Sequence, residues 1–211
     1  MLQVAGLAKR YGEVLALREL TVDVAEGGCL VLLGRNGAGK TTALRCMAGV
    51  LEPTSGTVRV DGIDSASDPA AVRARVGLMP EVPGLYERMS ARTYLDYFGA
   101  IYELEVRLRR HRIDELLYRF DLVDAADRWL GSYSKGMRQK VALIRATMHR
   151  PRLILADEPT GQLDSITASK LIEILLDSAT DSGAALIVAT HDRAVAKRMQ
   201  TQWRLVHGRI E

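Results

Sequence analysis

The sequence predicts an α/β protein with a mostly parallel sheet, and three observations support this. Short apolar runs of strand length, such as Cys29–Leu33 and Ala184–Ala189, alternate with segments whose apolar residues recur at helical spacing. A glycine-rich turn joins the first of these runs to a helical segment. The runs are continuously apolar, which is typical of strands covered by helices on both faces of a parallel sheet.

The first third of the chain is expected to form an antiparallel β subdomain. Leu2–Ala8 and Val14–Val24 alternate apolar and polar residues, as half-buried strands do, and Tyr11–Glu13 lies between them as a turn. Thr57–Val60 is a further strand, followed by the hairpin signal Asp61-Gly62. Between these parts, the buried strand Cys29–Leu33 leads into a helix over Thr42–Val50.

The middle of the chain, from about Ser90 to Arg150, is expected to be a helical insertion because it contains no proline and almost no β-branched run. Its apolar residues recur at helical intervals. They are Leu95, Phe98, Ile101 and Tyr102, and then Ile113, Leu116, Leu117 and Phe120.

After Pro151 the strand pattern returns. We expect a strand at Leu153–Ala156, a helix over Ser165–Ala179, a strand at Ala184–Ala189 and a closing hairpin over 203–210. The chain is therefore predicted to be one domain, 1–211. Segments 1–84 and 151–211 form the α/β core with its β subdomain, and 85–150 forms the helical subdomain.

Composition excludes several classes of protein. The 211 residues are 47% hydrophobic and 26% charged, and 29 basic against 26 acidic side chains leave a net charge of +3. This excess is too small to indicate nucleic acid as a partner. No apolar run approaches the ~20 residues that span a bilayer. Cys29 and Cys46 lie in or beside apolar segments, which favours reduced thiols in the cytosol.

The strongest motif lies between the strand Cys29–Leu33 and the following helix. It matches the P-loop pattern G-x-x-x-x-G-K-[ST], in which backbone N–H groups and a helix N-terminus cradle phosphates. Lys40 would reach the β- and γ-phosphates and the Thr41 hydroxyl would bind Mg²⁺. The sequence therefore predicts a P-loop NTPase core. Its expected nucleotide-binding residues are Gly34, Arg35, Asn36, Gly37, Ala38, Gly39, Lys40, Thr41 and Thr42.

A second motif places two acids directly after the apolar strand Leu153–Ala156. Such a strand delivers side chains to the edge of the sheet where ligands bind in open α/β folds. Asp157 would hold Mg²⁺, and Glu158 would orient or deprotonate the attacking water. Taken without the P-loop, the two acids could also simply cap the turn at Pro159. Because the same sequence contains a P-loop, we favour the catalytic interpretation of the two acids.

A third motif narrows the class of nucleotide-binding protein. The only asparagine is Asn36, so the N-K-x-D guanine-binding motif of GTPases is absent.

Tyr133–Lys140 runs into the amphipathic segment Val141–Met148, and a serine and a glycine at a helix start form another anion site. With the P-loop, the acidic strand, a loop over 161–164 and His191, this segment resembles the ATP-binding cassette (ABC) family, whose signature is L-S-G-G-Q.

The resemblance, which covers essentially the whole chain, implies roles for residues that spacing alone does not assign. In this family two cassettes pair head to tail. Ser134 and Gly136 would close over the γ-phosphate held by the partner's P-loop. Glu158 would be the general base, His191 would sense the γ-phosphate, and Tyr11 would stack on adenine.

The sequence departs from the family pattern at several positions. Glu81 stands where the family has glutamine, and it could still meet Mg²⁺ or the attacking water. The loop before Asp164 carries Gly161 and Gln162 in place of the family's residues. The signature form S-K-G-M-R-Q looks like the bacterial ABC-2 or sodium-exporter-like group, so we interpret these departures as marks of that subfamily.

The resemblance implies a subunit that binds and hydrolyses MgATP and powers an exporter. Its partners would be a separate transmembrane subunit docked near Glu81–Tyr102 and a second cassette, in a homodimer or a heterodimer. No nucleic acid is expected, and the expected location is the cytoplasmic face of the cell membrane. Two alternatives stay open: a soluble ABC ATPase acting as a mechanical or regulatory module, and a nucleotide-binding scaffold with little hydrolysis.

Overall fold

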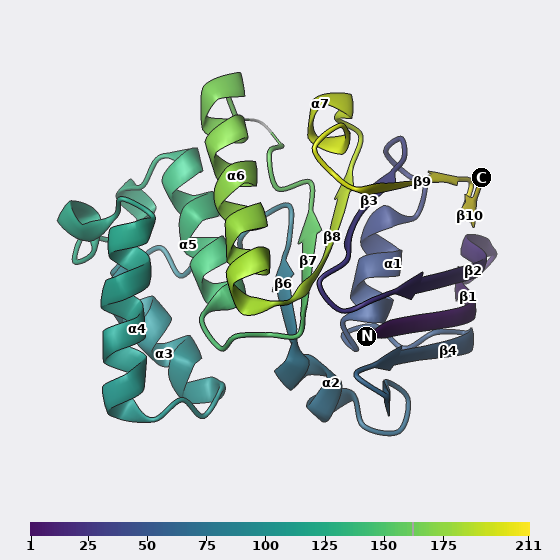
Figure 1. Ribbon diagram of the computed structural model, residues 1–211, viewed down its shortest axis with the longest axis horizontal. Helices are drawn as coiled ribbons and strands as arrows, with labels where there is room; N and C mark the ends of the chain where they lie inside the picture. Colours follow the sequence, from purple (N-terminus) through teal and green to yellow (C-terminus); the bar gives the residue numbers. More distant parts are fainter. Residues whose placement is uncertain (162) are drawn as a thin grey trace.

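The computed structural model, which describes residues 1–161 and 163–211, is built on two sheets and a block of helices (Figure 1). The four-stranded antiparallel sheet has the order β2-β1-β4-β5. Its strands are β1 (Leu2–Tyr11), β2 (Val14–Val24), β4 (Ser55–Val60) and β5 (Ile63–Asp64). The antiparallel N-terminal subdomain is therefore confirmed. β1 extends past the predicted end at Ala8, because irregularities in its pairing let it continue to Tyr11.

The central sheet has the order β10-β9-β3-β8-β7-β6 and is parallel except at β10. Its strands are β3 (Cys29–Leu33), β6 (Val76–Met79), β7 (Leu153–Asp157), β8 (Ala185–Thr190), β9 (Thr201–Val206) and β10 (Arg209–Ile210). Sequence reasoning did not assign β6, which is only four residues long and contains Gly77. The closing hairpin of β9 and β10 is confirmed.

The helices flank the central sheet. They are α1 (Lys40–Met47), α2 (Pro69–Arg75), α3 (Ala91–Ile101), α4 (Val106–Arg119), α5 (Lys135–Thr147), α6 (Ser165–Ser182) and α7 (Arg193–Ala196), with 3₁₀ turns at Val123–Ala125 and Leu130–Ser132. In Figure 1, α3 to α6 lie to the left of the strands and the antiparallel sheet lies to the right. Sequence reasoning did not assign α2, and the predicted helical middle is confirmed.

Two hydrophobic cores lie on opposite faces of the central sheet. Along β8, Leu186 and Val188 join the core formed with the helical block, whereas Ala185, Ile187 and Ala189 join the core formed with α1 and the antiparallel sheet. Successive side chains of a strand point to opposite faces. Both faces are therefore buried, which explains why this strand is a continuous apolar run.

Cys29 and Cys46 are both free thiols and form no disulfide with each other. Burial raises the pKa of Cys46 to about 11. Among the described residues, no helix combines the length and the apolar character needed to cross a membrane. The subdomain boundaries at residues 84 and 150 stay predictions.

The helix α5 lies unusually close to the central sheet at Gly77 of β6. A Cβ atom added at Gly77 would stand 1.9 Å from the carbonyl oxygen of Ala146. This approach matters for the site because α5 begins beside Ser134 and β6 leads to Glu81. Only glycine allows the backbones to pack this closely.

We expect Gly77→Ala to lower the free energy of unfolding by about 2 kcal/mol or more, because the added methyl group must push α5 away from the sheet. Urea denaturation measures the change. Gly131→Ala is the matched control. Its Cβ would lie 3.2 Å from the Glu87 carbonyl oxygen in an exposed turn, and we expect a loss below about 1 kcal/mol. Equal losses in the two variants would contradict this account.

Candidate functional site

Three parallel strands end side by side and bring distant segments of the chain to one edge of the sheet. In the register of β3 with β8, Leu33 pairs with Thr190, and in that of β7 with β8, Asp157 pairs with Ala189. The residues that follow these strands are Gly34, Glu158 and His191. Residues from the three sequence motifs therefore meet at the carboxyl ends of the strands, where ligands bind in such folds.

The P-loop turns from β3 into α1 and is backed closely by another strand. Gly39 adopts a φ of 104°, in the left-handed region that favours glycine, and its Cβ would lie 2.6 Å from the Ala16 carbonyl oxygen. Lys40 begins α1 and is only 6% exposed. A glycine is thus required where the loop enters the helix, and the lysine side chain is held inside the loop.

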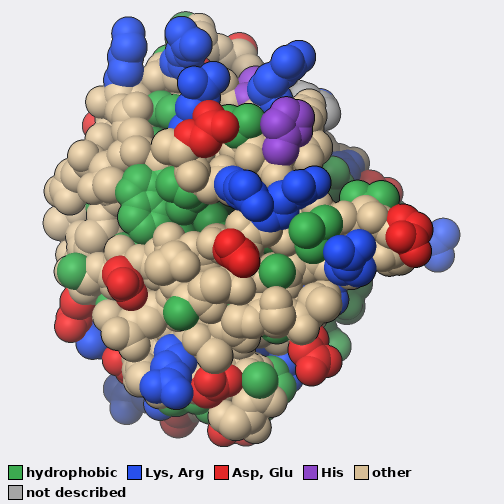
Figure 2. Space-filling model, turned by 90° about the vertical axis from the view of Figure 1, so that its right-hand side faces the viewer, with side chains coloured by type: hydrophobic (Ala, Val, Ile, Leu, Met, Phe, Trp, Pro, Cys, Tyr) green, Lys and Arg blue, Asp and Glu red, His purple; other side chains and the backbone are tan. Residues whose placement is uncertain are grey.

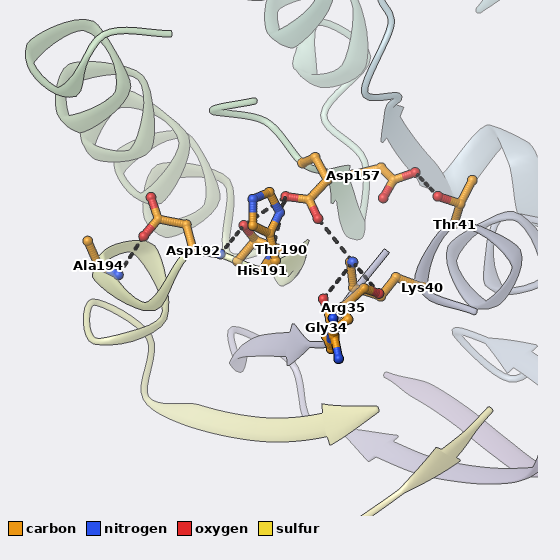
Figure 3. A network of polar contacts seen from close by, with 10 residues as sticks. Gly34, Arg35, Lys40, Thr41, Asp157, Thr190, His191, Asp192 and Ala194 are labelled. Carbon is orange, nitrogen blue, oxygen red and sulfur yellow. Dashed lines mark hydrogen bonds and ion pairs between the residues drawn. The ribbon is translucent and has the colours of Figure 1, made fainter. Parts of the chain in front are cut away.

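The Lys40 ammonium lies between the P-loop and the acidic strand (Figure 3). Its Nζ donates to the carbonyl oxygens of Gly34 (2.8 Å) and Arg35 (3.3 Å) and lies 3.0 Å from Glu158 Oε1. Both members of this ion pair are less than one-tenth exposed. A buried charge left alone is costly, so each stabilises the other in the absence of ligand.

Glu158 is held from two sides. Its backbone adopts a φ of 43°, outside the usual region for a glutamate, and its N–H donates to the Ala189 carbonyl oxygen at 2.8 Å. Its Oε2 accepts from Thr190 Oγ1 at 2.9 Å and lies 3.0 Å from His191 Nδ1. Burial by itself would raise the pKa of Glu158, but the contacts of His191, Lys40 and Thr190 outweigh it and lower the pKa below its ordinary value.

Asp157 has the features of a cation ligand. Thr41 Oγ1 donates to its Oδ2 at 2.6 Å, while Oδ1 is buried and, within residues 1–161 and 163–211, has no hydrogen-bond partner. Burial raises its pKa, opposed by the Thr41 hydroxyl and reinforced by the charges of Glu158 and Glu81. An unpartnered carboxylate oxygen beside a hydroxyl suits Mg²⁺, which prefers oxygen ligands.

A cavity of about 240 Å³ joins these groups. It is lined by Ala16, Asn36, Gly37, Gly39, Lys40, Thr41, Thr42, Glu81, Asp157 and Glu158. The described part of the chain offers no group of three or more His, Cys, Asp or Glu side chains arranged to hold a metal. A Mg²⁺ ion here would take its other ligands from phosphate oxygens and water, as it commonly does in phosphate-binding sites.

A larger cavity, of about 800 Å³, lies on the other side of the P-loop. Its charged or titratable lining side chains are Arg35, His191, Arg204 and His207, with no acid among them. The end of β9 and the turn at His207 form one wall, and the Gly208 N–H donates to the Ala38 carbonyl oxygen at 3.1 Å. Figure 2 shows histidine side chains among Lys and Arg in the upper part of this side of the molecule. The cavity favours an anionic occupant.

Most of the predicted site residues are brought together. Gly34 to Thr42, Glu81, Asp157, Glu158 and His191 all line one or both cavities. Three do not: Tyr11, Ser134 and Gly136. Tyr11 ends β1 and is 47% exposed, with Lys9 Nζ 5.5 Å from its ring centroid.

Ser134 caps the N-terminus of α5 and is exposed. Its hydroxyl oxygen accepts from the Met137 N–H at 3.3 Å. Gly136 lies against Thr167 of α6. Gly161 donates its N–H to the Glu158 carbonyl oxygen at 2.9 Å, whereas Gln162 lies outside the described residues. The signature segment, Tyr133–Lys140, thus starts a helix, as predicted, and neither Ser134 nor Gly136 lines the cavity that contains Lys40.

Sequence reasoning predicted the hairpin of β9 and β10 but missed its contact with the P-loop, and it missed the place of Thr190 at the site. Thr190 follows an entirely apolar run and precedes His191. A hydroxyl at the end of an apolar strand, next to a predicted site residue, is the sequence feature that could have indicated its role. Nothing in the local sequence indicates that the turn at Gly208 contacts the P-loop. That contact joins residues 38 and 208, which only the packing of β9 beside β3 brings together.

The sequence is similar to ATP-binding proteins of ABC transporters. The family profile described as ABC transporter matches residues 17–161. The chain is 39% identical over 196 residues to the ABC transporter ATP-binding protein NatA of Bacillus subtilis, covering 90% of this chain and 79% of the relative. It is 41% identical to the daunorubicin resistance ATP-binding protein DrrA3 of Streptomyces coeruleorubidus, covering 76% of this chain but 51% of that relative. The chain thus spans only about half the length of some relatives.

Solved structures of ABC cassettes have the same fold as this chain. A dimeric ATP-binding cassette in a post-hydrolysis state, bound to ADP and Pi, superposes with a TM-score of 0.91 at 27% identity, covering 100% of this chain and 97% of the other. An ATP-binding subunit of an ABC transporter gives a TM-score of 0.90 at 31% identity, covering 100% and 88%. The predicted fold class, a P-loop NTPase core with an antiparallel subdomain and a helical subdomain, is confirmed.

We expect Lys40→Met to lower the free energy of unfolding, measured without nucleotide, by about 3 kcal/mol, because the buried Glu158 carboxylate loses the cation beside Oε1. The double variant Lys40→Met/Glu158→Gln removes that charge and should recover most of the loss. Urea denaturation of the two single variants and the double variant measures the coupling. Additive losses would show that the pair does not stabilise the chain.

Proposed function

The chain belongs to the ABC transporter family, and from that premise we propose that it binds and hydrolyses MgATP to drive a membrane exporter. The observation that carries the proposal is the convergence of Lys40, Asp157 and Glu158 on one cavity beside His191. Transfer of a phosphoryl group to water requires a group that binds the phosphates, a ligand for the metal ion and a general base for the attacking water.

Each residue has a distinct part in the proposed reaction. Lys40 and the P-loop N–H groups bind the β- and γ-phosphates, and Thr41 and Asp157 would hold Mg²⁺, with Glu81 at the cavity wall. Mg²⁺, when bound, neutralises charge on the phosphate oxygens. Glu158 orients the attacking water and accepts its proton as the bond from water oxygen to γ-phosphorus forms and the bond from γ-phosphorus to the bridging oxygen breaks, which releases ADP and phosphate. His191 contacts the γ-phosphate.

The ion pair of Lys40 with Glu158 must open for this reaction. A triphosphate in the P-loop competes for the Lys40 ammonium, which releases Glu158 Oε1 to face water. ATP binding therefore prepares the base as well as the substrate. This coupling is proposed because Lys40 Nζ lies 3.0 Å from Glu158 Oε1, so the lysine cannot move to the phosphates without leaving the carboxylate.

The active form is proposed to be a dimer of cassettes, a homodimer or a heterodimer, in which each cassette supplies its signature segment, here Ser134 and Gly136, to the nucleotide site of the other. Neither residue lines the cavity of its own chain that contains Lys40, which supports this arrangement. The Ser134 hydroxyl and the start of α5 are exposed and offer an anion site. The similarity to a dimeric cassette supports the same arrangement.

We expect Glu158→Gln to abolish nearly all steady-state ATP hydrolysis and to form a dimer with MgATP, since nucleotide binds but the water is not activated. Phosphate release and size-exclusion chromatography measure the two effects. Unchanged turnover would reject Glu158 as the base. A wild-type chain that binds ATP without any hydrolysis would favour the scaffold alternative.

Two further changes in the Glu158→Gln background serve as controls. Lys40→Ala should prevent both ATP binding and the dimer. Ser134→Glu should leave ATP binding in place and prevent the dimer, because its carboxylate would meet the partner's phosphates. A dimer that persists with Ser134→Glu would argue against the role of the signature segment in the second copy.

The transmembrane partner is proposed to dock on an exposed hydrophobic surface formed by Val82, Tyr86 and Tyr97. All three are exposed, at 76%, 48% and 46%, and the ring centroids of the two tyrosines lie 6.2 Å apart. The surface follows β6 and Glu81, so a partner there would lie next to the nucleotide cavity. Docking would hold the chain at the cytoplasmic face of the membrane. Similarity to a daunorubicin resistance protein supports an exporter.

We expect the wild-type chain to co-purify with a polytopic membrane protein from detergent-solubilised native membranes. Tyr97→Glu should lose that protein, because a charge replaces an aromatic side chain of the docking surface. Tyr118→Glu, at an 80% exposed tyrosine of α4, is the matched control and should retain it. Absence of any polytopic protein with the wild-type chain would favour the soluble ATPase alternative.

A further inference from the structure

Thr190, the last residue of β8, carries a buried hydroxyl between the Glu158 carboxylate and α7. It is 0% exposed. Its Oγ1 donates to Glu158 Oε2 at 2.9 Å and accepts from the Asp192 N–H at 3.0 Å (Figure 3). None of the sequence motifs includes this residue.

The direction of the hydroxyl hydrogen is determined by these two contacts. A hydroxyl has one hydrogen to donate, and the Asp192 N–H occupies a lone pair of the oxygen. The hydrogen therefore points to Glu158. A β-branched side chain is also stiff about χ1. Asp192 in turn caps α7 by accepting from the Ala194 N–H at 2.7 Å, so the start of that helix orients the threonine.

Glu158 depends on this contact more than an ordinary glutamate would. Its backbone is pinned to Ala189 in a left-handed conformation, which leaves the side chain as the part still to be oriented. The Thr190 hydroxyl holds Oε2 on the β8 side, and Oε1 then faces Lys40 and the 240 Å³ cavity. His191 also contacts Oε2, but its side chain is 61% exposed, whereas Thr190 is enclosed.

We propose that Thr190 is a positioning residue for ATP hydrolysis, whose hydroxyl holds Oε2 of Glu158 so that Oε1 is directed to the attacking water. The inference rests on the proposed function. When ATP takes Lys40, Oε1 loses its partner, and the charge-assisted bond from Thr190 remains to orient the carboxylate. Thr190 itself touches neither ATP nor water.

The test compares substitutions that differ in the hydroxyl group. Thr190→Val keeps the branched shape without the hydroxyl, and Thr190→Ser keeps the hydroxyl without the methyl group. We expect Thr190→Val to lower kcat about tenfold to a hundredfold, as loss of a hydrogen bond to a charged group does, with KM for ATP within about twofold. Thr190→Ser should keep kcat within about threefold.

Further variants keep the result interpretable. Thr190→Ala replaces Thr190→Val if the latter fails to fold, since alanine and serine differ only in the hydroxyl. Thr180→Val is the control for an exposed threonine of α6 whose hydroxyl donates to the Leu176 carbonyl oxygen, and its kcat should not change. Binding of a non-hydrolysable ATP analogue should be the same in all variants.

Three results would overturn the proposal. Equal kcat losses in the serine and valine variants would show that the hydroxyl is not responsible, and a change in KM with constant kcat would show an effect on ATP binding. If the wild-type chain itself hydrolyses no ATP, the proposed function fails and this inference fails with it. Hydrolysis by the wild type with no difference between serine and valine rejects the inference alone.

Discussion

The register of three parallel strands is the constraint on which the rest of the site depends. β3, β8 and β7 pair so that Leu33, Thr190 and Asp157 end at one edge of the sheet. Lys40, Asp157, Glu158 and His191 lie at or after these ends, whereas Glu81 follows the neighbouring strand β6. A shift of one residue in any strand would turn its side chains to the other face and separate lysine, carboxylates and histidine.

That register is held by burial on both faces. The central strands divide their side chains between two cores, so neither face tolerates a slip. The close approach at Gly77 fixes how α5 sits on the sheet, and α5 begins at the signature segment. Core packing therefore sets the position of both the P-loop edge and the exposed Ser134.

The groups proposed for the reaction contact one another within the site. Lys40 and Glu158 neutralise each other in a buried environment, and Thr41 satisfies one oxygen of Asp157. In the proposed reaction, the oxygens of a triphosphate would take the place of Glu158 beside Lys40. The unpartnered Oδ1 of Asp157 marks where the internal contacts leave a place for the ligand.

The sequence by itself determined the fold class, the helical middle, the P-loop residues and the acidic pair, because these depend on local periodicity and on motifs with a direct physical reason. It did not predict β6, which is too short for a periodic signal, or the place of Thr190 and Gly208 at the site. Those contacts join residues far apart in the chain, as Thr190 to Glu158 and Gly208 to Ala38. Only the packing of the sheet decides them, since a hydrogen bond between distant residues leaves no pattern in either segment alone.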